Sequence, residues 1–216
     1  MKINSDNISD INMYGLDVVN REIYLHSHVG SLDEEGVDYR MAASFYKNIR
    51  ILETMSKEPI LIHMHSIGGS WYDGMAIFDA ISVADSFTTV VVYGQAESMS
   101  SIILQAADSR IMMPNSYFMA HYGTSGYGGD YLSVQKAASF EKKEMELMMD
   151  IYTDRLMYSE YIKQNYTDPT HEKVKNFIKR KLKDGDWFLS AEDAVFYGFA
   201  DNVLKSRKYP TIDSLK

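Results

Sequence analysis

Hydrophobic and polar residues follow two different spacings along this chain, and the spacings predict strands that alternate with helices. Apolar residues at every second position, or in short runs, predict strands at residues 21–29, 60–65, 88–93, 110–113 and 117–121. Apolar residues spaced three and four positions apart predict helices at residues 38–55, 71–84 and 98–108. Strands that alternate with helices are typical of βαβ units, so we expect an α/β fold with a largely parallel sheet.

The longest helical pattern covers residues 130–166 and is rich in Met and Tyr. A helix of this length is too long to pack wholly against one small domain. We therefore expect it to project as a handle and to bury its apolar stripe against a neighbouring subunit. Two shorter helices that both pack on the same domain are the alternative. Further on, Ser190 is a candidate N-cap for a short helix that stops near Gly198.

The chain has 216 residues, a length that fits one domain with a substantial core. Residues 1–18 are polar with scattered apolar residues, so we expect a flexible N-terminal arm there. Residues 19–204 then form a single domain that includes the handle, and residues 205–216 form a C-terminal tail.

Composition argues against several classes of function. The formal charge of −8 is not that of a nucleic-acid-binding surface. Because there is no cysteine, a disulfide framework and thiol catalysis are excluded. No apolar run approaches the ~18 residues of a membrane span, and the polar N-terminus does not resemble a secretory signal. We expect a cytoplasmic protein that binds neither nucleic acid nor membrane.

Ser98 is the most informative single residue, because it follows a predicted strand and opens an apolar helix. A hydroxyl at this place lies at the positive end of the helix dipole, beside backbone N–H groups that have no partner within the helix. Such a site can stabilise negative charge that develops on a substrate oxygen. Serine is also a favoured N-cap residue, so a purely structural role is the alternative.

Serine acyl transfer also needs a general base and donors for the oxyanion. His121 ends a neighbouring strand and is the candidate base, since a neutral imidazole can accept the hydroxyl proton. The backbone N–H groups of Gly69 and Met99 are the candidate oxyanion hole, and Gly69 lies in a turn that also ends a strand. Each residue has a plain structural reading, but their joint appearance at strand ends favours catalysis.

Several motifs that occur in order carry a resemblance to the ClpP-type serine peptidases over about residues 20–204. They are Ser66-Ile67-Gly68-Gly69-Ser70, Gly94-Gln95-Ala96-Glu97-Ser98-Met99, Met113-Pro114-Asn115-Ser116 with Met119-Ala120-His121, and Phe188-Leu189-Ser190-Ala191-Glu192-Asp193-Ala194 with Tyr197-Gly198.

The resemblance implies a crotonase-like ββα-spiral fold whose long helical handle interleaves two stacked rings, with heptameric rings expected. It also implies a serine endopeptidase that hydrolyses peptide bonds in unfolded proteins or peptides, with an AAA+ unfoldase as partner and no cofactor.

The third member of the catalytic triad is harder to place. Aligned without a gap, the family's aspartate falls on Leu182. A short shift in the preceding loop would bring Asp184 to His121, so Asp184 is our choice, with Asp186 or no carboxylate at all as alternatives. An imidazole without a carboxylate partner would lose orders of magnitude in rate.

Other positions also depart from the family's usual pattern. Ile67 replaces Pro, Glu97 replaces Ala and puts a carboxylate beside the nucleophile, and Ser100 replaces Gly. The family positions that form docking pockets for the unfoldase fall on Leu61, His63 and Ile111, of which His63 is polar.

Two pairs of histidines deserve a separate interpretation, namely His26 with His28 and His63 with His65. Each pair lies on one face of a predicted strand, an arrangement in which a metal site can be imagined. No carboxylate is interleaved at ligand spacing, so we interpret both pairs as the polar side of half-buried strands and expect no metal.

Two other functions stay open at this point. A displaced aspartate that leaves Ser98 unactivated would make the chain a catalytically silent structural or regulatory ring subunit. A dedicated maturation peptidase is the other alternative.

Overall fold

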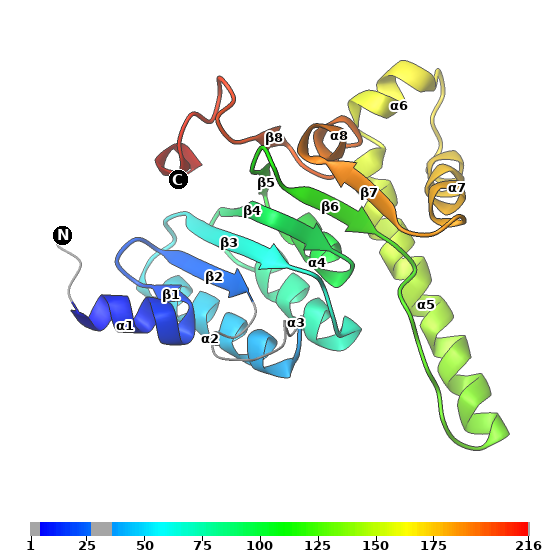
Figure 1. Cartoon of the computed structure of the whole chain (residues 1–216), viewed down its shortest axis with the longest axis horizontal. Helices are drawn as coiled ribbons and strands as arrows, with labels where there is room; N and C mark the ends of the chain where they lie inside the picture. Colours follow the sequence, from blue (N-terminus) through cyan, green and yellow to red (C-terminus); the bar gives the residue numbers. More distant parts are fainter. Residues whose placement is uncertain (1–4, 27–35, 216) are drawn as a thin grey trace.

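The computed structural model describes residues 5–26 and 36–215 (Figure 1). Its strands are β1 (Leu16–Asp17), β2 (Glu22–His26), β3 (Ile60–Ser66), β4 (Thr88–Glu97), β5 (Ser109–Met112), β6 (Tyr117–Ala120), β7 (Trp187–Ser190) and β8 (Asn202–Val203). Its helices are α1 (Ser5–Tyr14), α2 (Tyr39–Met55), α3 (Trp71–Ser82), α4 (Met99–Ile103), α5 (Tyr131–Leu156), α6 (Glu160–Asn165), α7 (His171–Leu182) and α8 (Ala191–Phe196), with 3₁₀ turns η1 (Leu104–Ala106) and η2 (Ile212–Leu215).

The expected α/β fold is confirmed by a mostly parallel sheet with strand order β1-β2-β3-β4-β5-β8. Strand β4 pairs with β3 along one edge and has two partners along the other edge. Its first half pairs with β5 and its last residues, Gln95–Glu97, pair with β6. Strand β7 then adds to β6 in the antiparallel direction. Strands β4 and β6 therefore end, and β7 begins, close together beside the start of α4.

Alternation along β2, β3 and β4 sends their side chains to two different layers. Ile62, Met64 and Val92 belong to the main core, against α2 and α3. Leu61 and Val91 face the other way and pack with Leu215 in a second, smaller cluster. The C-terminal segment therefore folds back onto the sheet face that α2 and α3 do not cover (Figure 1).

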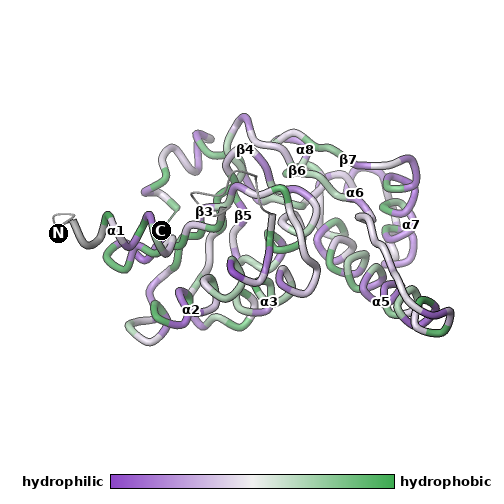
Figure 2. Tube along the Cα trace, turned by 60° about the horizontal axis from the view of Figure 1, so that its bottom comes forward, coloured by the Kyte–Doolittle hydropathy of each residue, from purple (hydrophilic) through white to green (hydrophobic). Residues whose placement is uncertain are grey.

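The handle is two helices rather than the single helix that we expected over residues 130–166. Helix α5 ends at Leu156, and Ser159 begins α6 by accepting a hydrogen bond from the N–H of Ile162. The serine competes with helix continuation because its hydroxyl caps a new N-terminus. Helix α5 still reaches away from the sheet, and hydrophobic and hydrophilic residues alternate along it (Figures 1 and 2). Its exposed apolar residues include Tyr131, Leu132 and Phe140.

Helices α1 and α7 form where the sequence analysis predicted no helix. Part of the expected flexible arm forms α1. The carbonyl of Tyr14, the last residue of this helix, accepts a hydrogen bond from Asn48 of α2 at 2.7 Å. Helix α7 was not expected either, although Val174, Phe177 and Ile178 bury one of its faces. The division into arm, domain and tail remains a prediction.

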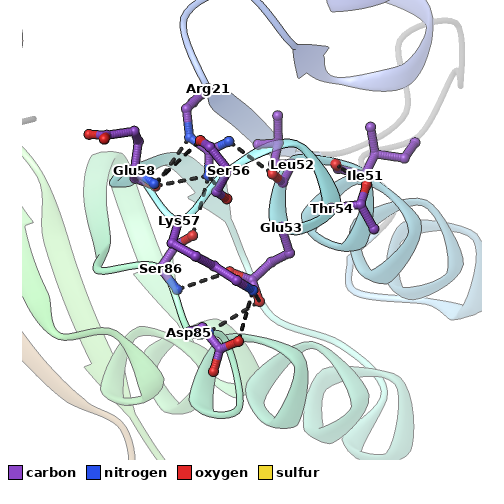
Figure 3. Close-up of polar contacts among 10 residues, drawn as sticks. All are labelled: Arg21, Ile51, Leu52, Glu53, Thr54, Ser56, Lys57, Glu58, Asp85 and Ser86. Carbon is purple, nitrogen blue, oxygen red and sulfur yellow. Dashed lines mark hydrogen bonds and ion pairs between the residues drawn. The ribbon is translucent and has the colours of Figure 1, made fainter.

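Arg21 holds the C-terminal end of α2 (Figure 3). Its backbone is in the left-handed region, with φ of 57°. Its guanidinium donates to the carbonyl oxygens of Leu52, Ser56 and Glu58 at 2.9, 3.2 and 2.8 Å. The carbonyls of Ser56 and Glu58 lie at and beyond the end of the helix, where backbone acceptors lack intrahelical partners, so the arginine supplies donors there. The carbonyl of Leu52 also accepts from the N–H of Ser56.

Glu53 ties α2 to the chain that follows α3 (Figure 3). Its carboxylate accepts from the backbone N–H groups of Asp85 and Ser86 at 3.1 and 2.9 Å and from Lys57 at 3.3 Å. Burial raises the pKa of Glu53, but these hydrogen bonds outweigh it and lower the pKa to about 2. The ionised carboxylate therefore stabilises the fold at neutral pH.

Candidate active site

Strand β4 delivers Ser98 in a strained backbone conformation. Ser98 has φ of 53° and ψ of −124°, a region that residues other than glycine rarely adopt. Its N–H donates to the carbonyl of Met119 in β6 at 2.9 Å, and its own carbonyl accepts from the N–H of Ser101 at 3.1 Å. Hydrogen bonds on both sides of the residue thus hold the strained turn in place.

The side chain of Ser98 does not cap the helix that it precedes. Ser70, Ser159 and Ser190 each accept a backbone N–H as N-caps, whereas Ser98 makes no such bond. Its Oγ lies instead 2.7 Å from Nε2 of His121. The sequence left open a structural N-cap role and a catalytic role for Ser98. This geometry contradicts the N-cap role.

Strand pairing explains why His121 meets Asp186. Ala120 of β6 lies opposite Trp187 of β7 in an antiparallel ladder, so the next residue of one strand faces the preceding residue of the other. Nδ1 of His121 is accordingly 3.1 Å from Oδ1 of Asp186. The hydrogen bonds join Ser98, His121 and Asp186 in a row.

This arrangement corrects our choice of Asp184. Asp184 is exposed in the turn that follows α7, and the carboxylate at His121 belongs to Asp186, which was the alternative. Leu182, the residue given by the gapless alignment, is buried in the core. Strand β7 fixes the position of Asp186 directly before its first residue, whereas Asp184 lies two residues further from the ladder.

The hydrogen bonds define the protonation pattern that the site needs. When Nδ1–H donates to Asp186, the lone pair of Nε2 faces the hydroxyl of Ser98 and can accept its proton. The side chain of His121 is 24% exposed and that of Asp186 is 50% exposed. Because half of the carboxylate is in contact with water, its interaction with the imidazole is partly screened.

The Gly68–Gly69 turn packs directly against the serine. Gly68 has φ of 92°, and a Cβ atom there would lie 2.5 Å from Cβ of Ser98. Val37 anchors the turn, because its N–H donates to the carbonyl of Gly68 and its carbonyl accepts from the N–H of Ser70. Only glycine fits this close approach.

One expected oxyanion donor, Met99, follows Ser98 along the chain, and the other, Gly69, follows the glycine that packs against Ser98. Met99 is the first residue of α4, where backbone N–H groups have no intrahelical acceptor. Gly69 follows Gly68 in the turn and has φ of 149°. Within the part of the chain that the structure describes, neither N–H is used in a backbone hydrogen bond. Both N–H groups are therefore available as donors, and their role as the oxyanion hole stays a prediction.

Two hydrogen-bonded supports hold the site, and the sequence analysis identified neither. The first joins Ser100 to Ser66. Ser100 donates to Oγ of Ser66 at 2.7 Å, and Ser66 in turn accepts from the N–H of Gly68 at 3.3 Å. Ser100 stands where the family usually has glycine, so its hydroxyl is an addition that stiffens the turn.

The second support is a hydrogen-bond chain from the handle to the nucleophile. Ser101 Oγ donates to the carbonyl of Ser98 at 2.6 Å and lies 2.7 Å from the hydroxyl of Tyr152. Since the serine proton is already used, the phenol is the donor in the second bond. Tyr152 is fully buried on α5, and burial raises its pKa, so it keeps its proton.

Among the side chains that the structure describes, no three His, Asp or Glu gather in a way that could hold a metal ion. No helix in residues 5–26 and 36–215 is both long enough and apolar enough to cross a bilayer. Of the histidine pairs, His28 lies outside the described residues.

Comparison with known proteins places the whole arrangement in one family. Residues 19–207 match the family described as Clp protease. A relative from Deinococcus radiodurans, named ATP-dependent Clp protease proteolytic subunit, is 29% identical over 171 residues, which cover 78% of this chain and 76% of the relative. Two proteins named ATP-dependent Clp protease proteolytic subunit 2 are each 28% identical. The one from Tropheryma whipplei aligns over 78% of this chain and 87% of its own length, and the one from Pseudomonas aeruginosa over 82% and 81%. The resemblance noted from the motifs is confirmed, and the chain belongs to the Clp protease family.

Proposed function

We propose that this chain is an active serine endopeptidase and the proteolytic subunit of a compartmental protease. The observation that carries the proposal is the position of the Ser98 hydroxyl. It makes no cap hydrogen bond to α4 and lies 2.7 Å from Nε2 of His121. The 3.1 Å contact between Nδ1 of His121 and Asp186 supports it further. A nucleophile, a base and a group that orients the base are the parts that acyl transfer needs.

The reaction follows from these contacts. His121 accepts the proton of Ser98 as Oγ attacks the carbonyl carbon of the substrate, and Asp186 stabilises the imidazolium that forms. The N–H groups of Gly69 and Met99 hold the oxyanion, and one such donor lowers the barrier by roughly 3–4 kcal/mol. His121 then protonates the leaving amine, and a water molecule that His121 activates hydrolyses the acyl-enzyme.

The partners follow from the relatives and from the handle. The relatives' names describe ATP-dependent proteolytic subunits. We therefore propose an AAA+ unfoldase that supplies unfolded chains, a homo-oligomer of stacked heptameric rings, and a cytoplasmic location. The exposed apolar residues of α5 support the ring assembly, because a surface of this kind is normally covered by a partner.

Peptide hydrolysis tests the proposal. The protein should cleave a short fluorogenic peptide without ATP, and Ser98→Ala should abolish the cleavage while the oligomer seen by sedimentation stays unchanged. Folded protein substrates should be degraded only when an unfoldase and ATP are added. An assembled protein that cleaves no peptide under any of these conditions would instead be the catalytically silent ring subunit.

A further inference from the structure

Helices α3 and α4 pack against each other at a glycine (Figure 1). Gly74 is buried in the first turn of α3 and faces the side chain of Met99, the first residue of α4. A Cβ atom at Gly74 would lie 2.1 Å from Cγ of Met99 and 2.8 Å from both its Sδ and its Cε. The methionine side chain therefore occupies the space that any other residue at position 74 would need for its own Cβ.

The backbone of α3 gives no reason for a glycine at this position. Gly74 lies inside a regular helix, and its φ is not in the left-handed region that favours glycine. Glycine is a poorer helix former than alanine, so the chain accepts a less stable helix here. The close contact with Met99 is the feature that requires glycine.

A second glycine of the same segment approaches the backbone of Met99. A Cβ atom at Gly68 would lie 2.8 Å from the backbone nitrogen of Met99. The side chain of Met99 is 3% exposed and belongs to the main core, where close packing leaves it little free space to move into. Gly68 and Gly74 therefore hold the backbone and the side chain of one residue.

Hydrogen bonds make the segment between these two glycines a single rigid unit. The N–H of Gly74 donates to the carbonyl of Ser70 at 3.0 Å, and the N–H of Ser70 donates to the carbonyl of Val37 at 2.8 Å. The N–H of Val37 in turn donates to the carbonyl of Gly68 at 2.6 Å. Gly69, which carries one of the two candidate oxyanion donors, lies inside this unit, so a contact at Gly74 also fixes its position.

We infer that Gly74 is a positioning residue for the oxyanion hole. Because the side chain of Met99 fits against Gly74, the first turn of α3 and the start of α4 approach closely. This approach sets the separation between the N–H groups of Gly69 and Met99. Gly74 itself is buried and acts through Met99 rather than by contact with the substrate. The inference rests on the proposed function, which gives these two N–H groups an oxyanion to hold.

Gly74→Ala should lower the rate of catalysis without weakening the binding of substrate. Carbon atoms in contact lie about 3.5–4.0 Å apart, so the added methyl group displaces Met99 by about 1.5 Å. Misplacement by about 1 Å can cost about 10²-fold in rate, and loss of one oxyanion donor costs about 10²- to 10³-fold. We expect kcat for a fluorogenic peptide to fall about 10- to 100-fold, with KM within about twofold of the parent. Ala76→Ser adds one atom on the exposed side of the same helix and should leave both constants unchanged.

A double variant shows whether the effect passes through Met99. Met99→Ala keeps the backbone N–H and removes Cγ, Sδ and Cε, the three atoms that Gly74 faces. Adding Gly74→Ala to Met99→Ala should therefore cause no further loss of kcat, whereas two independent defects would multiply. This comparison also decides the matter where Gly74→Ala alone fails to assemble. A double variant about 10- to 100-fold less active than Met99→Ala, or a Gly74→Ala protein with the kcat of the parent, would overturn the inference.

A peptide boronate separates positioning from a general loss of structure. Oγ of Ser98 bonds to boron as its proton passes to His121, and an oxygen of the tetrahedral boronate then takes the place of the oxyanion. Gly74→Ala should weaken inhibition by the boronate at least about tenfold. In a Ser98→Ala background, Gly74→Ala should bind the uncleaved peptide with unchanged affinity in fluorescence anisotropy. Equal weakening of both ligands would indicate a structural defect and would overturn the inference.

The behaviour of the parent protein separates this inference from the proposed function. A parent that hydrolyses peptide and binds the boronate, with a Gly74→Ala variant that does both equally well, contradicts only the role of Gly74. An assembled parent that neither hydrolyses peptide nor binds the boronate contradicts the proposed function and, with it, the role of Gly74.

Discussion

Replacement of Asp186 by asparagine tests the part of the site that the sequence left undecided. Asp186→Asn keeps the size of the side chain and removes the charge that faces Nδ1 of His121 at 3.1 Å. A hydrogen bond to a charged group contributes about 1.5–3 kcal/mol, which corresponds to a 10- to 150-fold change in rate. A fully buried triad aspartate is worth about 10⁴-fold. Because Asp186 is 50% exposed, we expect the lower range, a loss of about 10- to 100-fold in kcat.

The assay is steady-state hydrolysis of a fluorogenic peptide by the assembled protein. KM should change little, because the carboxylate acts on the imidazolium of the transition state and does not touch the substrate. Asp184→Asn is the matched control, since it removes the same charge two residues away, and it should stay within about twofold of the parent. The reasoning is refuted if Asp184→Asn costs as much as Asp186→Asn, or if Asp186→Asn keeps full kcat.

Three further predictions concern the supports of the site and the fold. Tyr152→Phe removes only the hydroxyl that reaches Ser101, and kcat should fall about three- to tenfold with KM unchanged, since one buried hydrogen bond is worth about 1 kcal/mol; equal kcat for the two proteins would contradict the role of this bond. Gly68→Ala puts a Cβ 2.5 Å from Cβ of Ser98, so peptide hydrolysis should be lost in a protein that still assembles, as sedimentation can check; activity near the parent level would contradict the packing. Glu53 has its pKa lowered to about 2 in the folded protein, so its contribution to stability, about 3 kcal/mol, is complete above about pH 4.5 and is lost as the pH falls toward 2. Denaturant unfolding should therefore show Glu53→Gln to be less stable at pH 7 and flatter in its acid dependence, and an unchanged pH profile would argue against that assignment.

The sequence predicted the elements whose spacing is regular and whose neighbours are close along the chain. The strand before His121 could be located because its apolar run stops at a polar residue, whereas the strand before Ser98 was predicted to end at residue 93 and continues to Glu97. The pairing of Ser98 with His121 depends on β4 pairing with β6 over Gln95–Glu97, although β5 lies between these strands in the sequence.

The third carboxylate could not be chosen from the sequence, because the choice depends on strand register. Asp184 and Asp186 are both polar residues of one loop, and only the ladder between β6 and β7 tells them apart. A signal was present in the alternation after Asp186, since Trp187 and Leu189 are buried and Phe188 is exposed. Read as a strand, this segment would have placed Asp186 at its start.

The handle shows a different limit. The apolar pattern of α5 continues past residue 156, so periodicity alone gave one helix over 130–166. The break arises because Ser159 caps α6, and Tyr161 of α6 then packs against Phe177 and Tyr197. A cap of this kind is a local choice between two hydrogen-bonding patterns of similar energy, which tertiary packing decides.

Covalent labelling by a fluorophosphonate probe tests the central claim most directly, because only an activated serine reacts. Intact-mass analysis should show one adduct per chain, peptide mapping should locate it on Ser98, and Ser98→Ala should take up none. His121→Ala should react far more slowly, while Asp184→Asn should label at the parent rate. An assembled protein that gains no adduct under conditions that label a control serine hydrolase, or that is labelled equally well as Ser98→Ala, would contradict the account.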